Sequence, residues 1–302
     1  MRSTFTTYLR LVLALFISVL AINANGQQIE QFSQFDEQMY ILNPGVAGTT
    51  DYFEAKGVNR SQWTGVTDAP RTFAMSLQAP LKNPHLGLGG FLMTDNVGPT
   101  RRTSLQFSWT YQVFLNDDLK LGLGVSAGLL QFTIDGSKIT LVDEGDPALF
   151  SEMNSQTVFD AKFGAYLHKD NWYAGFSLPQ LLQNQVQLFE STSSDLSKLE
   201  DHYLIMGGYT HELNNQFKVQ ANALAKFVSP VSPALDANIK AYYQNKVNVG
   251  VGYRHQDALI FMAGYEYREA ISIGFSYDMT TSALKNYSNG TYEVMVGFRF
   301  NQ

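Results

Sequence analysis

Six charged side chains in the C-terminal third of the sequence have the types and spacing expected of a polar site. They fall on alternate positions of predicted strands, opposite the apolar face, and carry both signs in comparable numbers. If the strands close into a barrel, as predicted below, these residues would line its interior. The lining could then be a self-neutralising network that holds the wall and any plug, a surface that contacts an inserted partner segment, or a pore with little ion selectivity. The candidate partner-binding residues are Asp236, Lys240, Arg254, Asp278, Glu293 and Arg299.

No other group of residues predicts catalysis or a metal site. The acidic stretch from Asp143 to Asp146 lacks the regular ligand spacing of a calcium loop, and no G-x-S-x-G nucleophile turn occurs. We therefore expect a protein that is not an enzyme, without cofactor, catalytic residues or metal. The histidines have neither the i, i+2 strand spacing nor the i, i+4 helical spacing of a zinc site. They are His85, His168, His202, His211 and His255.

Composition excludes several further classes of protein. The net charge is -6, only 16% of residues are charged, and no Lys/Arg cluster resembles a nucleic-acid footprint. The absence of cysteine removes lipoprotein acylation, disulfides and thiolate metal sites. Aromatic residues make up 13% of the chain and glycine contributes 24 residues, a composition typical of outer-membrane barrels.

The elements that must position the polar residues are β-strands with one apolar face. In the last strand, Tyr292, Val294, Val296, Phe298 and Phe300 alternate with polar or small residues. We assign this apolar face to lipid, because the opposite faces carry too many amides and charges for a dry core. Alternation is poor only near 86–94 and 202–212. Fourteen strands are expected near 52–60, 71–80, 86–94, 101–115, 119–133, 157–168, 171–178, 202–212, 216–226, 234–244, 247–255, 258–266, 271–279 and 290–300.

The strand count and the connections predict an all-β, transmembrane, antiparallel up-and-down β-barrel of the outer-membrane type. An even strand count and alternation of short inner turns with longer outer loops are expected of such barrels. The longest outer loops would be Ile134 to Gln156 and Pro179 to Asp201. One connection breaks this alternation, because Gln256-Asp257 should be an outer loop but is as short as the inner turns. The predicted inner turns are Lys82 to Pro84, Asn116 to Asp118, Lys169-Asp170, Asn214-Asn215 and Asn245-Lys246.

The chain divides into three parts. Residues 1–26 combine positive charge, the apolar run Leu11 to Ile22 and small residues at Ala24 to Gly26, which predicts a cleaved signal peptide and an outer-membrane location. Residues 27–50 form an N-terminal segment that is too apolar for a free tail. It either contacts a periplasmic partner or plugs the inner mouth of the barrel, which spans residues 51–302. The candidate residues of this segment are Phe35, Met39, Tyr40, Asn43 and Pro44.

Several motifs resemble a known family in order and spacing. Gln38 to Gly48 reads QMYILNPGVAG and is similar to the pattern Q-x-M-x-x-x-N-P-x-x-A-G of the PorP/SprF outer-membrane proteins of the type IX secretion system in Bacteroidota. The chain departs from the family at Gly290 to Glu293, where Tyr292 replaces a common histidine. The resemblance also rests on Arg60 to Trp63, Ala69 to Thr72, Gly87 to Gly89, Tyr253-Arg254, Asp257-Ala258 and Gly274 to Asp278.

The resemblance implies a non-enzymatic component that docks or anchors exported proteins at the cell surface through their C-terminal signal domain, linked to secretion and to gliding motility. Its expected partners are an exported protein with a type IX C-terminal domain, a peptidoglycan-linked or other secretion-system component in the periplasm, and outer-membrane lipid. No nucleic acid is expected. A general diffusion porin or channel is the alternative, and a membrane-embedded enzyme ranks third.

Overall fold

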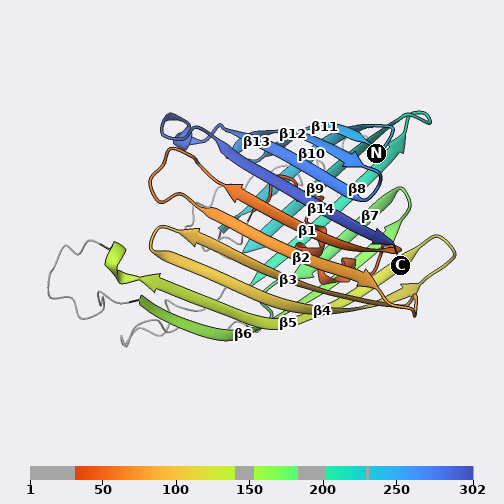
Figure 1. Ribbon diagram of the computed structural model, residues 1–302, viewed down its shortest axis with the longest axis horizontal. Coiled ribbons are helices and arrows are strands. Elements are labelled where there is room, and N and C mark those ends of the chain that lie inside the picture. Colours follow the sequence, from red (N-terminus) through yellow and green to blue (C-terminus); the bar gives the residue numbers. More distant parts are fainter. Residues whose placement is uncertain (1–30, 140–152, 183–200, 229–230, 302) are drawn as a thin grey trace, which may run out of the picture.

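A computed structural model describes residues 31–139, 153–182, 201–228 and 231–301. The fourteen strands form one closed antiparallel barrel in which each strand pairs with its sequence neighbours and β1 closes against β14 (Figure 1). The predicted fold class is therefore confirmed. The strands are β1 Tyr52–Ser61, β2 Arg71–Pro80, β3 Leu86–Val97, β4 Thr100–Phe114, β5 Lys120–Asp135, β6 Met153–Lys169, β7 Trp172–Leu178, β8 His202–Glu212, β9 Phe217–Val228, β10 Val231–Tyr243, β11 Val247–Arg254, β12 Ala258–Tyr267, β13 Ile271–Thr280 and β14 Thr291–Asn301.

The two faces of the strands separate as the alternation predicts. On β14, Tyr292 and Phe298 are exposed on the outer surface, whereas Glu293 and Met295 are buried in the lumen. The same alternation on the other strands surrounds the barrel with exposed Leu, Val, Ile and aromatic side chains, which is the apolar band of an outer-membrane barrel.

The connections differ between the two ends of the barrel. At the end where β1 begins, every turn has five residues or fewer, and the predicted turn residues Lys82 to Pro84 and Asn214-Asn215 lie there. We take this end as periplasmic and the opposite end as extracellular, following the rule for bacterial barrels. The expected outer-loop pattern is only partly correct. β3 and β4 are joined by Gly98-Pro99 alone, and β10 begins at Val231, directly after 229–230, so three extracellular connections are short rather than one.

The strand pairs at the extracellular end are longer than expected, which shortens the loops. β5 continues to Asp135 and β6 already begins at Met153, because the polar residues there extend the hairpin beyond the apolar band. The predicted signal peptide, the acidic stretch at 143–146 and most of the two longest loops lie outside the described residues.

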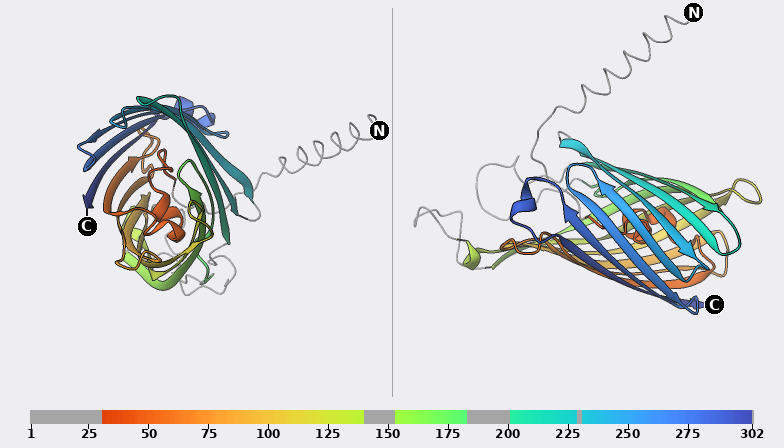
Figure 2. Two further views of the ribbon diagram at one scale, coloured as in Figure 1. Left: turned by 90° about the vertical axis from the view of Figure 1, so that its right-hand side faces the viewer. Right: turned by 90° about the horizontal axis from the view of Figure 1, so that it is seen from above.

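The N-terminal segment of the described chain, residues 31–50, lies inside the barrel (Figure 2). It contains one turn of α-helix, α2 Met39–Leu42, followed by a 3-10 turn, η2 Pro44–Val46. Two further 3-10 turns, η3 Gly136–Lys138 and η5 Ala283–Asn286, belong to extracellular connections. Among the described helices, none has the length and apolar character needed to span a bilayer.

Candidate functional site

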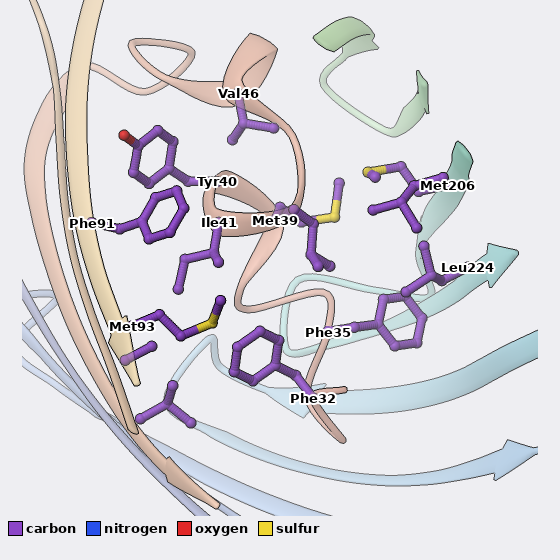
Figure 3. Close-up of a cluster of buried hydrophobic side chains, with 14 of the residues drawn as sticks. Phe32, Phe35, Met39, Tyr40, Ile41, Val46, Phe91, Met93, Met206 and Leu224 are labelled. Carbon is purple, nitrogen blue, oxygen red and sulfur yellow. The ribbon is translucent and has the colours of Figure 1, made fainter. Parts of the chain in front are cut away.

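Residues 31–50, here called the plug, form an apolar cluster with several strands of the lumen wall (Figure 3). Phe35 and Tyr40 are almost fully buried, and the ring of Tyr40 meets that of Phe91 edge to face at 6.3 Å between centroids. The wall contributes apolar lumenal side chains from β3, β8 and β9. The plug residues of the cluster are Phe32, Phe35, Met39, Tyr40, Ile41, Leu42, Val46 and Ala47, and the wall residues include Phe91, Met93, Leu204, Met206 and Leu224.

The turn that follows α2 sits directly on the backbone of the wall. The side-chain amide of Asn43 donates to the carbonyls of Ala165 at 3.0 Å and Phe176 at 3.3 Å, while its Oδ1 accepts the N–H of Gly45 at 2.9 Å. Pro44 fits here because it stands at the first position of η2, where its missing N–H is not needed. Its carbonyl oxygen accepts the hydroxyl of Thr110 at 2.6 Å. The motif Asn-Pro-Gly thus fixes both the turn and its seat on the wall.

Glycines on the wall make this close approach possible. A Cβ atom on Gly124 would lie 2.3 Å from the carbonyl carbon of Pro44, and one on Gly122 would lie 2.1 Å from the carbonyl oxygen of Gly45. Gly164 would meet Asn43 Oδ1 at 2.0 Å. Any larger residue would therefore push the plug off the wall.

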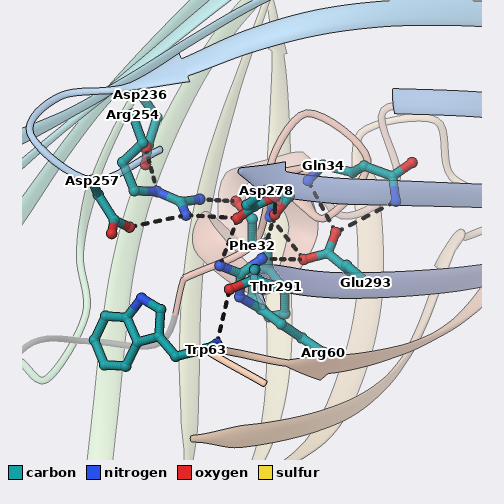
Figure 4. A network of polar contacts seen from close by, with 12 residues as sticks. Phe32, Gln34, Arg60, Trp63, Asp236, Arg254, Asp257, Asp278, Thr291 and Glu293 are labelled. Atoms are coloured by element: carbon teal, nitrogen blue, oxygen red, sulfur yellow. Dashed lines mark hydrogen bonds and ion pairs between the residues drawn. The ribbon is translucent and has the colours of Figure 1, made fainter. Parts of the chain in front are cut away.

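A buried ionic network lies in the lumen on strands β1, β10, β11, β13 and β14 (Figure 4). Arg60 lies 3.0 Å from Asp278 and 3.4 Å from Glu293. Arg254 lies 2.7 Å from Asp236 and 3.0 Å from the same Asp278. Each of these five side chains is at most 3% exposed, so removal of one partner would leave a buried charge without compensation, which is strongly destabilising.

The network binds the backbone at the start of the plug. Glu293 accepts hydrogen bonds from the N–H groups of Ser33 at 2.7 Å and Gln34 at 3.0 Å. The Ser33 hydroxyl donates to Asp278 at 2.6 Å and accepts from Arg60. Arg254 also donates to the carbonyl oxygen of Phe32 at 3.2 Å. The polar lining is thus occupied by a segment of the same chain.

Two acidic plug residues form a second set of ion pairs, closer to the periplasmic end. Lys240 lies 2.6 Å from Asp36 and 3.3 Å from Glu37, and Lys56 lies 3.5 Å from Glu37. Burial alone would raise the pKa of Glu37, but the two ammonium groups outweigh burial and lower the pKa to about 2. The carboxylate therefore stays charged at physiological pH.

The structure brings five of the six predicted lumenal residues into these two sets, and Arg299 is linked to the second set through Glu54, which lies 3.1 Å from Lys56. Arg299 pairs with Glu266 at 2.5 Å and lies 3.7 Å from Glu54. It lines a cavity of about 740 Å³ at the periplasmic end, together with Glu37 and Tyr242. This cavity is here called the periplasmic vestibule.

Sequence reasoning missed several partners in the network. Arg60 was noted only as part of a family motif, although its position on the lumenal face of β1 matches that of Lys56. Ser33, Asp36 and Glu37 lie outside any strand, so strand periodicity gave no signal for them. All five predicted residues of the N-terminal segment lie in the lumen and are buried, and in this conformation they are inaccessible to a periplasmic protein. They are Phe35, Met39, Tyr40, Asn43 and Pro44.

The described residues contain no group of three His, Asp or Glu side chains arranged to hold a metal ion. The ring of His85 stacks between Tyr111 and Phe114, and its Nδ1 lies 2.8 Å from the carbonyl oxygen of Gln112. His85 therefore packs against the periplasmic rim. Its contacts are those of a structural side chain.

Comparison with solved structures supports the barrel fold. The monoaromatic hydrocarbon channel CymD is 12% identical, with a TM-score of 0.53 over 92% of this chain and 95% of its own. A FadL homologue from Pseudomonas aeruginosa is 11% identical, with a TM-score of 0.50 over 86% and 92%. A TodX deltaS2S3 mutant channel is 11% identical, with a TM-score of 0.51 over 87% and 94%. At these identities the likeness concerns the fold alone.

Comparison of the sequence itself is more specific. None of the curated proteins matches this chain. The family model described as "Type IX secretion system membrane protein PorP/SprF" matches residues 24–298, which include the plug, both ionic sets and every strand of the barrel except the end of β14. The chain therefore belongs to the PorP/SprF family of type IX secretion system membrane proteins, and it is an outer-membrane β-barrel of that system.

Proposed function

We propose that this barrel is a non-enzymatic anchor that holds an exported protein at the cell surface by that protein's C-terminal domain. The observation that carries the proposal is the plugged lumen. The plug is seated on glycines on one side and bound by ion pairs on the other. A lumen closed in this way suits retention of cargo at the surface better than passive diffusion.

The plug also bears on where cargo would bind. Glu293 and Arg254 already bind the backbone of residues 32–34, and Asp278 accepts the hydroxyl of Ser33. Cargo would therefore reach these lumenal residues only if that part of the plug left them. We therefore assign the first contact to the extracellular loops. The loop at 62–70 suits this contact, because it is held to the β13–β14 connection. The N–H of Thr64 donates to the carbonyl oxygen of Gly290 at 2.8 Å.

Periplasmic partners, including a peptidoglycan-linked component, would meet a different surface. The five candidate residues of the plug are buried, whereas the short turns and the periplasmic vestibule, which Glu37 of the plug also lines, are open at that end. We assign contact with the secretion and gliding machinery to this end. This assignment rests on accessibility only. The vestibule carries both acidic and basic side chains, so its charge does not indicate a particular partner.

Site-specific crosslinking from single cysteines tests this proposal, since the chain has no cysteine of its own. Thr67 lies exposed in the extracellular loop and Asn215 lies exposed in a periplasmic turn. With a thiol-linked photocrosslinker in native membranes, Thr67→Cys is expected to capture an exported protein that carries a type IX C-terminal domain. Asn215→Cys is the matched control and should capture none. Recovery of the barrel alone from the Thr67 position would overturn the docking role.

The porin alternative makes a different prediction. A diffusion porin would conduct stably with the plug in place, and the close fit of the Asn-Pro-Gly turn against Gly122 and Gly124 opposes this. Conductance of the intact protein therefore separates the two functions.

A further inference from the structure

The outer surface of β2, β3 and β4 carries two arginines at its extracellular rim. Arg71 and Arg101 are exposed and point away from the lumen, on the same faces as Phe73 and Leu105. Asn96 lies between them, because it is the register partner of Arg71 on one side and of Arg101 on the other. In the part of the chain that the structure describes, neither arginine forms an ion pair. Two unneutralised cations thus lie on the wall that faces lipid.

The rows of residues below them change from polar to apolar. The next row toward the periplasm is Phe73, Thr94 and Thr103, and the row after it is Met75, Leu92 and Leu105. Met75 is 54% exposed, as expected for a side chain that contacts acyl chains. Each row lies about 7 Å further along the strands. The arginine row therefore lies at the boundary where acyl chains end and headgroups begin.

A pocket of about 410 Å³ opens beside this row. Arg71 and Asn96 of the wall line it, together with residues of the loop at 62–70. The N–H of Gly98 donates to the carbonyl of Asp68 at 3.0 Å, which ties the loop to the β3–β4 turn. Lys138 of η3, whose ammonium group lies 3.6 Å from Asp135, contributes a second cationic group to the lining. The pocket is thus built from three extracellular connections.

The chemistry of the lining indicates one class of ligand. Arg71 and Lys138 supply cationic donors that suit phosphate oxygens. Neutral hydrogen-bonding side chains and one carboxylate, that of Asp68, suit the hydroxyl groups of a sugar. The remaining polar lining residues are Ser61, Gln62, Thr64 and Asn96.

We propose that this pocket and the adjoining Arg101 bind the phosphorylated sugar headgroup of an outer-leaflet glycolipid. A membrane lipid is favoured over a soluble anion because the apolar rows directly below continue the site toward the acyl chains. Among the described residues of the rim across the barrel, no such pair of outward arginines occurs. There, Leu235, Tyr253 and Leu259 of β10, β11 and β12 are the exposed outward residues.

The test measures binding of bisphosphorylated lipid A to the detergent-solubilised full-length mature protein by native mass spectrometry. The variant R71Q/R101Q replaces each guanidinium by a shorter neutral amide and so removes both charges at exposed positions. We expect it to bind lipid A about a hundredfold more weakly, at about tenfold for each charged hydrogen-bonding group lost. Arg268→Gln removes an exposed cation at the periplasmic end and should leave the affinity unchanged.

Two further ligands identify what the site recognises. Dephosphorylated lipid A should bind the wild-type protein as weakly as lipid A binds R71Q/R101Q, and inorganic phosphate at the same concentration should not displace lipid A. Equal affinity of wild type and R71Q/R101Q would overturn the site. Tight binding of the dephosphorylated lipid, or displacement by inorganic phosphate alone, would overturn its assignment to a phosphorylated glycolipid. Unaltered gel migration of unheated R71Q/R101Q checks that the barrel is intact.

Discussion

Glu293, on the last strand, accepts the backbone N–H of Ser33, near the start of the plug, at 2.7 Å. The two residues are 260 positions apart in the sequence. Because Glu293 is fully buried and also faces Arg60, the plug backbone and the barrel wall satisfy one another's charges and donors. The plug is therefore part of the folded barrel.

Replacement of Glu293 should weaken the closed barrel strongly. Glu293→Ala leaves the Arg60 guanidinium short of a carboxylate and leaves the N–H groups of Ser33 and Gln34 unpaired. Breaking a buried pair in this way costs about 3–5 kcal/mol. The heating temperature at which the folded gel band is lost should fall clearly below that of wild type. Glu212→Ala, at an exposed strand end, is the control, and an equal effect of both changes would contradict the account.

The seat of the Asn-Pro-Gly turn predicts a sharp difference between two glycines. Gly124→Ala adds a methyl group that would lie 2.3 Å from the carbonyl carbon of Pro44. A Cβ on Gly57, by contrast, would have no atom within 4 Å. The first change should destabilise the plug by roughly 1–3 kcal/mol through overpacking, and the second should have little effect. Limited proteolysis of the N-terminal segment reports displacement of the plug. Equal protection in both variants would show that the seat is not close-packed.

The ion pairs of Glu37 predict a specific pH dependence. The pKa of Glu37 is lowered to about 2 in the folded protein, against about 4.3 in an unfolded chain. Its contribution to stability is therefore fully present above pH of about 4.3 and is lost as the pH falls from there toward about 2. The stability difference between wild type and Glu37→Gln should stay constant from neutral pH to about pH 5 and shrink below that. A difference that already vanishes at pH 6 would contradict this contact.

Most of the barrel could be predicted from the sequence because apolar side chains that face lipid alternate with polar side chains that face the lumen along most strands. The two strands with poor alternation, β3 and β8, are informative in retrospect. Phe91 and Met93 on β3, and Leu204 and Met206 on β8, are apolar on the lumenal face because they pack against the plug. The weak alternation in these two strands thus indicates where the lumenal side chains are apolar and contact the plug.

The plug contacts could not be predicted in the same way. Glu293 and Ser33, or Gly124 and Pro44, meet only through the closure of the whole barrel, and no local period relates them. The charge lining indicated a polar network, but its ligand, the start of the chain's own plug, required the three-dimensional arrangement. A glycine inside a strand permits either a bend or a close approach of another segment, and the structure gives the second role to Gly122 and Gly124.

The most direct test of the central claim is the conductance of the purified protein in planar bilayers, compared with a variant that lacks residues 32–48. The closed lumen predicts no stable conductance for the intact protein and steady ohmic channels for the deletion variant. The deletion also serves as evidence that the barrel inserts under the same conditions. Stable channels of the same size from both proteins would show that the N-terminal segment does not close the barrel.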